Sequence, residues 1–315
     1  MFIEECIPND AMIIHNILNN KGFETYFVGG ALRDLAINEI HGSSLKIKDW
    51  DLTTVARYED MLKIFNKLLR VKERGKFVNK RGRVELLIPR LETTGISIGR
   101  KMFEITPMNR ILNNENVFTN VLSEDLSKRD FTMNAMAYNI KSGLISSFKN
   151  NNGEMINSME DINNKLIRST DEPKLAFSRN YYNMFRAVLF ANRFGFDIEG
   201  ETLDAIRELA EHVCDINKGK LSVGFETLIM CDNFDNIFYL MDSGIMNNVC
   251  SDWDDYLMSE MIELFQKMPI EEKDYFNRLK FLYENFSDAE KIVEFFRIFG
   301  VNKNILLRFE NDIRK

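Results

Sequence analysis

The sequence predicts an α+β protein in which a mixed β-sheet comes first and helices follow. Short β-type runs alternate with helical runs over the first 145 residues, strand signals then fade, and helical spacing continues to the C-terminus. A chain of 315 residues with 45% apolar content is long enough for two or three domains with buried cores. We therefore expect domains at residues 1–145, 146–218 and 219–315.

Composition predicts a soluble, cytoplasmic chain that is not attached to a membrane. No uninterrupted apolar run approaches the roughly 20 residues of a membrane span, and the start "MFIEECIPND" is acidic where a signal peptide is basic and then apolar. The four cysteines and three histidines are scattered without metal-ligand spacing. We expect buried thiols and surface imidazoles, and neither a zinc site nor a disulfide framework.

The first predicted strand, "TYFVGG", ends in Gly29 and Gly30 and leads into the helix "ALRDLAINE". Glycines at this point let the backbone approach a ligand closely, and the free N–H groups at a helix start attract phosphate oxygens. Arg33 would add positive charge near the phosphates, whereas Asp34 would lock the turn. A plain turn is the alternative interpretation of the two glycines on their own.

The second predicted strand, "KDWDLTT", carries two carboxylates on one face. Alternate side chains of a strand share a face, so Asp49 and Asp51 project together, about 6.6 to 7 Å apart, while Trp50 and Leu52 face the core. Glu104, on the alternating strand "KMFEITPM", is the best third carboxylate. Such acids repel unless divalent cations lie between them, and Mg²⁺ prefers carboxylate and phosphate oxygens. A solvated strand edge remains the alternative for an isolated Asp-x-Asp.

Charge is unevenly distributed along a chain of net charge −7. Residues 62–101 carry twelve Lys or Arg against three Glu, whereas residues 251–274 carry eight acids against two lysines. This polarity suits a protein that holds a polyanion on one side only. A solvated charged helix and hairpin explain the basic stretch equally well.

Helical spacing dominates after the polar link "GLISSFKNNNG". Helices are predicted over "MEDINNKLIRS" and over the long run "AFSRNYYNMFRAVLFANRFGF". In the long run an apolar stripe recurs at helical spacing, formed by Phe177, Tyr181, Met184, Phe185 and Val188. Polar residues fall on the other side: Arg179, Asn180, Asn183 and Arg186.

Four motifs together resemble one family, the class II CCA-adding enzymes and bacterial poly(A) polymerases of the polymerase-β-like nucleotidyltransferase superfamily. "VGGALRD" is similar to its Gly-Gly-x-x-Arg-Asp segment, "KDWDLTT" to its metal-binding strand, and "FEITPMNR" to the strand with the third carboxylate. "DLSKRDFTMNAMAYN" closely resembles its Arg-Arg-Asp-Phe-Thr-x-Asn-Ala block, with Lys128 in place of the first arginine. The resemblance covers residues 25 to 200.

The resemblance implies a palm-like nucleotidyltransferase head followed by a helical neck, body and tail. Asp49 and Asp51 would bind two Mg²⁺ ions, with Glu104 completing the catalytic set. A nucleoside triphosphate, ATP or CTP, would be bound by the glycine turn, by the neck and by the Arg-Asp-Phe-Thr block. These nucleotide-binding residues would be Gly29, Gly30, Arg33, Asp34, Arg129, Asp130, Asn134, Arg179, Asn180, Asn183 and Arg186.

The sequence departs from the family pattern at two places. The family reads the base with a Glu-Asp-x-x-Arg segment, where this chain has Arg179, Asn180 and Asn183. An amide presents both a donor and an acceptor. Asn180 and Asn183, expected three residues apart on one helix face, would therefore contact a base edge without imposing one fixed pattern of donors and acceptors. The segment "ILNNENVFTNVLSED" is shorter than the family's flexible loop.

The resulting prediction is template-independent addition of one or a few nucleotides to an RNA 3′ end, foremost that of tRNA. A poly(A)-type polymerase and a diverged transferase with altered base choice or acceptor are the alternatives among enzymes. An inactive RNA-binding scaffold is the alternative from another class. Three surviving carboxylates favour catalysis, because a protein that only bound RNA would not need a cluster of like charges.

Overall fold

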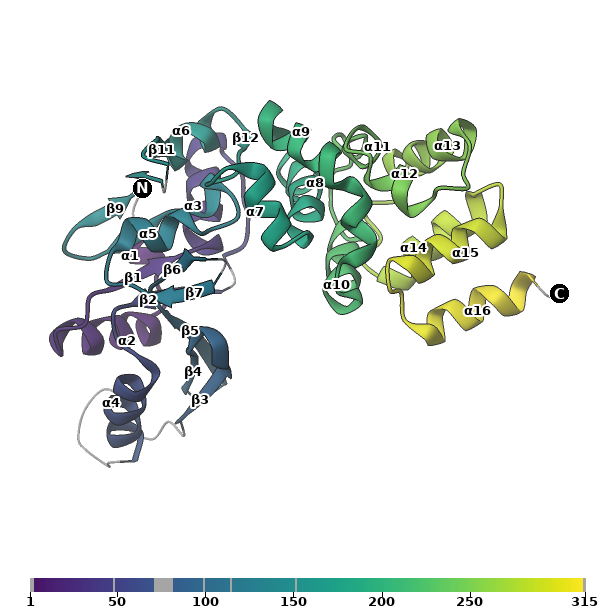
Figure 1. Ribbon diagram of the computed structural model, residues 1–315. Coiled ribbons are helices and arrows are strands. Elements are labelled where there is room, and N and C mark those ends of the chain that lie inside the picture. Colours follow the sequence, from purple (N-terminus) through teal and green to yellow (C-terminus); the bar gives the residue numbers. More distant parts are fainter. Residues whose placement is uncertain are drawn as a thin grey trace. The chain divides into compact units, whose positions relative to one another are not determined.

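The computed structural model describes residues 3–47, 49–70, 82–98, 100–113, 115–150 and 152–313. The chain divides into two compact units, residues 1–164 and 165–315, each of which is described by itself. Figure 1 follows the elements along the sequence. Within the basic stretch 62–101, residues 71–81 and 99 lie outside the described residues. None of the described helices combines the length and the apolar content needed to cross a bilayer.

A seven-stranded mixed sheet forms the centre of the first unit, as the sequence predicts (Figure 1). Its strands follow the order β3-β4-β5-β2-β1-β8-β9. The β2–β5 pair is parallel and the other pairs are antiparallel. The bounds are β1 Thr25–Val28, β2 Asp51–Thr54, β3 Gly82–Ile88, β4 Thr93–Ile98, β5 Lys101–Pro107, β8 Ala137–Asn139 and β9 Gly143–Ile145.

Strand register brings the predicted motifs to one place. Val28, the last residue of β1, pairs with Asp51 on one side and with Ala137 on the other, so the glycine turn emerges beside both the carboxylate strand and the end of the Arg-Asp-Phe-Thr block. Leu52 pairs with Ile105, and both are buried. Because side chains alternate along a strand, Asp51 and Glu104 lie on the opposite face of neighbouring strands.

Helices and short hairpins complete the first unit. Helix α4 packs against β3 and β4, α2 packs against β1, and α3 packs against α6. The helical bounds are α1 Ile3–Cys6, α2 Asn9–Asn20, α3 Gly30–His41, α4 Tyr58–Arg70, α5 Leu122–Ser127 and α6 Ser158–Asn163, with 3₁₀ turns η1 Pro89–Leu91 and η2 Thr132–Asn134. The hairpins pair β6 Asn109–Leu112 with β7 Glu115–Phe118, and β10 Ser147–Lys149 with β11 Met155–Asn157.

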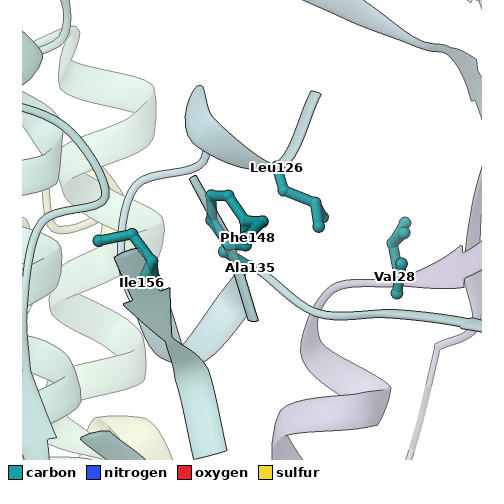
Figure 2. Close-up of a cluster of buried hydrophobic side chains, with 6 residues drawn as sticks. Val28, Leu126, Ala135, Phe148 and Ile156 are labelled. Atoms are coloured by element: carbon teal, nitrogen blue, oxygen red, sulfur yellow. The ribbon is translucent and has the colours of Figure 1, made fainter. Parts of the chain in front are cut away.

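One hydrophobic cluster lies beneath the glycine turn and helix α5 (Figure 2). It joins Val28, which precedes Gly29, to Leu126 of α5, and it contains Val28, Leu126, Ala135, Ala137, Phe148 and Ile156. All six are at most 7% exposed. Burial of apolar area at about 25 cal/mol per Å² therefore fixes β1, α5 and the β10–β11 hairpin against one another.

The first unit extends beyond the predicted boundary at residue 145. The link "GLISSFKNNNG" was expected to be irregular, but it contains β9 and β10, and the unit continues through α6 to residue 164. Two long-range hydrogen bonds fasten α6: Thr132 donates to Asp161 at 2.6 Å, and Ser158 donates to the Ala135 carbonyl at 3.0 Å. Local sequence does not reveal such partners, because they lie more than 20 residues apart.

The second unit is almost entirely helical, as predicted. Its only pairing of strands among the described residues is parallel, between β12 Leu166–Ile167 and β13 Asp197–Ile198. Its helices are α7 Pro173–Arg179, α8 Tyr182–Phe194, α9 Gly200–Leu209, η3 Ala210–Asp215, α10 Lys218–Ile229, α11 Tyr239–Asp242, α12 Ile245–Val249, α13 Asp255–Gln266, α14 Tyr275–Asn285, α15 Ala289–Ile298 and α16 Lys303–Ile313. The division between neck and body at residue 218 stays a prediction.

Two of the predicted helices are shorter than expected. The helix expected over 159–169 ends at Asn163, because Lys165 has a φ of 54° and the chain then enters β12. The helix expected over 176–196 is two helices, α7 and α8, separated at Asn180, whose φ of −156° and ψ of 88° are not helical. Asn180 and Asn183 therefore do not share one continuous helix, which corrects the predicted helix face.

Close packing and one buried arginine hold the second unit together. A Cβ at Gly224 of α10 would lie 2.8 Å from the Tyr182 hydroxyl, so α8 and α10 approach very closely. The Arg278 side chain is fully buried on α14. Its guanidinium donates hydrogen bonds of 2.6–2.7 Å to four backbone carbonyls, those of Ile229, Cys231, Ile270 and Glu272. The arginine thus joins the end of α10 to the segment before α14.

Two cysteines and one histidine differ from the expected exposure. Cys231 and Cys250 are buried thiols, but Cys6 and Cys214 are exposed. His15 of α2 is only 2% exposed and stacks on Phe27 with ring centroids 5.0 Å apart. The helical pattern of α2 places His15 beside Ile14 on its buried side, where a neutral imidazole acts as an apolar ring.

His15 makes stability depend on pH. Burial lowers the pKa of His15 below its ordinary value of 6.5, opposed in part by hydrogen bonds involving Asn16 and Thr25. Below pH 6.5 the unfolded chain therefore binds more protons at this histidine than the folded chain does. The free energy of unfolding is not reduced by His15 above pH 6.5 and falls as the pH is lowered below it. We expect His15→Leu to reduce the loss of stability between pH 7 and 5.5, measured by urea unfolding. An unchanged pH dependence would contradict this role.

Candidate active site

The strand carboxylates occupy one face of neighbouring strands. Asp49 is exposed and Asp51 is partly buried, while Trp50 between them is 6% exposed and packs edge-on against Phe27, with the ring planes at 84°. This alternation agrees with the predicted strand geometry, although β2 begins only at Asp51. Glu104 lies exposed on β5 beside Asp51.

Electrostatics confirm that these acids act on one another. Burial first, then Glu104 and more weakly Asp49, raise the pKa of Asp51 to about 6, although the Arg129 guanidinium opposes the rise. A carboxylate with a raised pKa beside two other acids holds its negative charge at a cost. An added cation would remove that cost.

The backbone of the glycine turn comes close to both an anionic and a cationic side chain. Gly29 precedes α3 with a φ of 79° and a ψ of −146°, a conformation accessible almost only to glycine. A Cβ built at Gly29 would lie 3.5 Å from Asp51 Oδ2 and 3.7 Å from Arg129 Nη1. The turn, the carboxylate strand and the Arg-Asp-Phe-Thr block therefore meet at Gly29.

Several predicted nucleotide-binding residues form a buried network beneath this turn. Arg33 is 6% exposed; it donates to Asp34 Oδ1 at 2.6 and 2.8 Å and to Asn134 Oδ1 at 2.8 Å. Asn134 in turn donates to Asp130 Oδ1 at 3.0 Å. A Cβ at Gly30 would lie 3.2 Å from the Arg33 guanidinium. These contacts connect α3 to the Arg-Asp-Phe-Thr block and give Arg33 a structural task that the sequence did not reveal.

Arg129 reaches the glycine turn from the end of α5. Its Nη2 atom lies 3.5 Å from Asp125 Oδ2, one helical turn earlier. Asp125 is buried and also contacts Lys128, with Nζ 3.0 Å from Oδ1. Burial lowers the pKa of Lys128, opposed by Asp125. Asp125 is not among the predicted site residues, although its i,i+4 spacing from Arg129 is typical of helical ion pairs.

The shortened segment between Arg110 and Asp125 forms the β6–β7 hairpin and the first half of α5. Glu124 holds both ends of this hairpin: Arg110 donates to its carboxylate at 2.7 Å, and the Thr119 hydroxyl donates to the same group. The backbone N–H of Asn109 donates to Asp125 Oδ1 at 3.0 Å. Two consecutive acids therefore fix the hairpin base to α5.

The oxygen atoms on the carboxylate face are donors of the kind that a divalent cation binds. Hard cations take oxygen ligands, and Mg²⁺ binds through one or two carboxylates together with substrate phosphates. Asp51 and Glu104 supply such oxygens, and the pKa of Asp51 is raised first by burial and then by the nearby Glu104. Across the part of the chain that the structure describes, no three acidic, histidine or cysteine side chains converge tightly enough to hold one ion together. A pair of carboxylates, with phosphate oxygens, is the arrangement that fits.

The predicted base-reading residues lie together in the second unit. Asn180 Nδ2 donates to Asn183 Oδ1 at 3.0 Å, across the break between α7 and α8. Arg179 donates to the nearly buried Asp171 at 3.1 Å. The Arg186 guanidinium lies over the Phe190 ring, 5.0 Å from its centroid. The pair of amides is therefore maintained although Asn180 is not helical.

Comparison with known proteins relates the first unit to one domain family. Residues 25–168 match the model of the poly A polymerase head domain. The CCA-adding enzyme of Geobacillus sp. (strain WCH70) is 31% identical over 226 residues, covering 70% of this chain and 48% of that protein. The CCA-adding enzyme of Staphylococcus epidermidis is 30% identical over 229 residues, covering 72% and 51%. The chain thus spans about half the length of the curated relatives it matches.

Solved structures share the fold over nearly the whole chain. The crystal structure of the Bacillus stearothermophilus CCA-adding enzyme in complex with CTP superposes with a TM-score of 0.75 and 23% identity, covering 96% of this chain and 68% of that one. The Thermotoga maritima CCA-adding enzyme complexed with tRNA gives a TM-score of 0.69 at 19% identity, covering 99% and 72%. The solved structures thus show the fold, and the head-domain match over residues 25–168 together with the curated relatives shows that the chain belongs to the nucleotidyltransferase family of the poly A polymerase head domain.

Proposed function

We propose that this protein is a template-independent RNA nucleotidyltransferase that adds one or a few nucleotides to the 3′ end of an RNA, foremost a tRNA. The 3′ oxygen forms a bond to the α-phosphorus of ATP or CTP, the bond from that phosphorus to the bridging oxygen breaks, and pyrophosphate leaves. The hydroxyl proton passes to solvent.

One observation carries this proposal. The backbone at Gly29 lies between Asp51 Oδ2 and Arg129 Nη1, each less than 4 Å from the position of a missing Cβ. A triphosphate resting on this turn meets backbone N–H groups at the start of α3, a planar cationic fork and a carboxylate strand. Few substrates other than a metal-bound triphosphate require backbone N–H donors, a cationic side chain and carboxylates at one point of a protein.

Membership of this family implies dependence on a divalent metal ion. We assign the ligands to Asp49 and Asp51, with Glu104 completing the set on the neighbouring strand, and we propose two Mg²⁺ ions. Bound there, the ions would supply acidity to the attacking hydroxyl and neutralise charge on the departing oxygen. The raised pKa of Asp51 supports this assignment, because the Arg129 guanidinium offsets only part of the rise caused by burial and the neighbouring acids.

The protein residues hold and orient the triphosphate. Arg129 neutralises phosphate charge through a planar fork, and the turn at Gly29 and Gly30 supplies donors from the backbone. Arg33, Asp34 and Asn134 act beneath the turn, since their mutual hydrogen bonds of 2.6–2.8 Å keep the Arg-Asp-Phe-Thr block against α3. Pre-organised groups of this kind stabilise charge that develops in the transition state.

The proposed acceptor RNA and the proposed nucleotide are taken from what similar proteins bind. One similar structure is a complex with CTP and another is a complex with tRNA. Because the chain spans only about half of its curated relatives, these partners are part of the proposal. A cytoplasmic location accords with a tRNA substrate.

Incorporation of labelled nucleotides tests the function directly. The protein is incubated with Mg²⁺, each labelled triphosphate in turn, and tRNAs that lack all, part or none of the terminal CCA. One to three defined additions to the truncated tRNAs support tRNA repair, whereas a long homopolymer supports a poly(A)-type polymerase. If no nucleotide is incorporated on any RNA while Mg²⁺ and triphosphate are present, the enzymatic proposal fails and an RNA-binding scaffold is the better account.

The amide pair in the second unit favours a second candidate, a transferase with altered base choice. In the Asn180–Asn183 bond, one oxygen remains as an acceptor and one amino group remains as a donor. Rotation of both amides by 180° exchanges these roles, because the oxygen and nitrogen of an amide have nearly the same shape. A fixed aspartate–arginine pair lacks this freedom. We therefore propose weaker discrimination among bases than in enzymes with the charged pair.

Restoring the charged pair tests this candidate. We expect Asn180→Asp combined with Asn183→Arg to change the ratio of kcat/KM for CTP and ATP to that for GTP and UTP by about tenfold, or about 1.4 kcal/mol. The single variants serve as controls, because each presents only half of the pair. If the double variant keeps the wild-type ratios with full activity, the amides do not read the base.

Gly29 provides a sharper test of the phosphate cradle. Gly29→Ala places a methyl group between Asp51 and Arg129 in a backbone conformation that costs other residues about 1–3 kcal/mol. We expect kcat/KM for the nucleotide to fall at least about tenfold. Gly42→Ala is the matched control, since Gly42 also has a positive φ, of 64°, but a Cβ there meets nothing within 4 Å. Equal losses in both variants would contradict the cradle.

A further inference from the structure

Asp125 makes contacts with two parts of the first unit through two different oxygens. Oδ2 lies 3.5 Å from Arg129 Nη2. Oδ1 accepts the backbone N–H of Asn109, at the base of the β6–β7 hairpin, at 3.0 Å and lies 3.0 Å from Lys128 Nζ. The side chain is only 2% exposed, so the carboxylate is almost shielded from water. A shielded carboxylate with several charged and polar partners has little freedom to move.

The two terminal nitrogens of Arg129 lie near different groups. Nη2 is 3.5 Å from Asp125 Oδ2, whereas Nη1 lies 3.7 Å from the point that a Cβ at Gly29 would occupy. Because the guanidinium is planar, pairing of Nη2 with Asp125 fixes the direction in which Nη1 points. Asp125 therefore determines which edge of Arg129 is presented at the glycine turn.

The hydrophobic cluster of Figure 2 makes this arrangement rigid. Leu126, next to Asp125, is 0% exposed and lies in the same cluster as Val28, which directly precedes Gly29. The strand that ends at the turn and the helix that carries Asp125 are thus anchored in one core. Close-packed interiors hold such neighbours to small displacements.

We propose that Asp125 is a positioning residue, which orients Arg129 toward the triphosphate at the Gly29 turn and connects it to the base of the β6–β7 hairpin. This inference rests on the proposed function, because it assumes that Arg129 contacts the triphosphate. Asp125 itself does not touch the nucleotide. Its effect passes entirely through Arg129.

A double-mutant cycle tests the inference in the full-length protein. Equilibrium binding of ATP and CTP with Mg²⁺ is measured calorimetrically for wild type, Asp125→Asn, Arg129→Met and the double variant. We expect Asp125→Asn to raise the nucleotide Kd, and the KM in the incorporation assay, about tenfold, with the KM for RNA unchanged. In the Arg129→Met background the same substitution should change the nucleotide Kd less than about twofold.

Neighbouring residues provide the controls. Glu124→Gln loosens the same hairpin through Arg110 and Thr119 but makes no described contact with Arg129, and it should leave the nucleotide Kd within about twofold of wild type. Asp125→Asn leaves the largely buried Lys128 without its carboxylate. If that variant does not fold, the cycle is repeated in Lys128→Met, where no buried charge is left behind.

The outcomes separate the two proposals. A wild type that binds nucleotide, together with an Asp125→Asn effect equal in both Arg129 backgrounds, overturns the positioning role alone. An Asp125→Asn variant that folds and binds nucleotide as wild type does also overturns it. A wild type that binds no triphosphate overturns the proposed function and this inference with it. An effect that disappears in Arg129→Met supports the positioning role.

Discussion

Asp51→Asn is expected to abolish nucleotide incorporation, lowering kcat by at least about 10³-fold, because one neutral amide removes a ligand charge at the centre of the catalytic face. The Asp51 carboxylate lies beside Gly29, and both Glu104 and Asp49 raise its pKa. The measurement is single-turnover incorporation of labelled CTP and ATP at saturating RNA. Retention of more than about a tenth of the wild-type rate would contradict the assigned role.

The same substitution is expected to stabilise the metal-free first unit. Burial and the neighbouring acids raise the pKa of Asp51 from 3.8 to about 6, so its ionised form destabilises the folded state at pH 8 by about 3 kcal/mol. This penalty is present above pH 6 and disappears as the pH falls below 3.8. Asparagine carries no charge and avoids it at every pH.

Thermal unfolding in EDTA at pH 8 measures this effect. Trp50 reports on the first unit in a Trp253→Phe background, because the chain contains two tryptophans, one in each unit. Adding Mg²⁺ should stabilise the wild type and have little effect on Asp51→Asn. A lower melting temperature of Asp51→Asn in EDTA would show that the carboxylate is not under repulsion.

Arg278→Met is expected to destabilise the second unit by about 3–5 kcal/mol. Methionine fills much of the same space, but the buried carbonyls of Ile229 and Cys231 lose donors at 2.7 and 2.6 Å. The Ile270 carbonyl keeps Lys273 Nζ as a donor at 2.9 Å. Asp232 is 3.7 Å away and largely exposed, so it remains solvated. The cost therefore comes mainly from unsatisfied buried carbonyls.

Urea unfolding followed by Trp253 fluorescence in a Trp50→Phe background measures this change. Arg278→Lys should recover only part of the loss, since one ammonium group cannot reproduce the four directions of a guanidinium. Arg207→Met is the matched control: its guanidinium pairs with Asp204 and Asp242 at the surface, where such pairs contribute about 0–1 kcal/mol. Equal losses for Arg278→Met and Arg207→Met would refute the buried role.

The strands of the candidate site were predictable because their signals are local. The short apolar run before the two glycines identified the strand at Thr25–Val28, and apolar alternation identified the strand at Lys101–Pro107. Period-two alternation also predicted that Asp51 and Glu104 point away from the buried side chains of their own strands. Helix α8, by contrast, was merged with α7 because the apolar stripe continues through Tyr181, which stacks on His212 at 4.4 Å. The spacing of side chains did not reveal the change in backbone at Asn180.

Residues that support the site were missed where their partners are distant in sequence. Arg33 contacts Asn134 across 101 positions, and Thr132 contacts Asp161 across 29. No window of local sequence contains both members of either pair. Asp125 and Arg129, by contrast, are four residues apart, which is a local signal for a helical ion pair.

By itself, the sequence determined the α+β class, the order of a mixed-sheet unit before a helical one, and the presence of residue types suited to phosphate and metal. These properties follow from side-chain period and chemistry, which each stretch of chain carries locally. Tertiary structure alone decided that Gly29, Asp51 and Arg129 meet, that Arg33 is buried beneath the turn, and that the first unit ends at residue 164. The physical reason is that strand register and buried hydrogen bonds depend on which distant segments exclude water together.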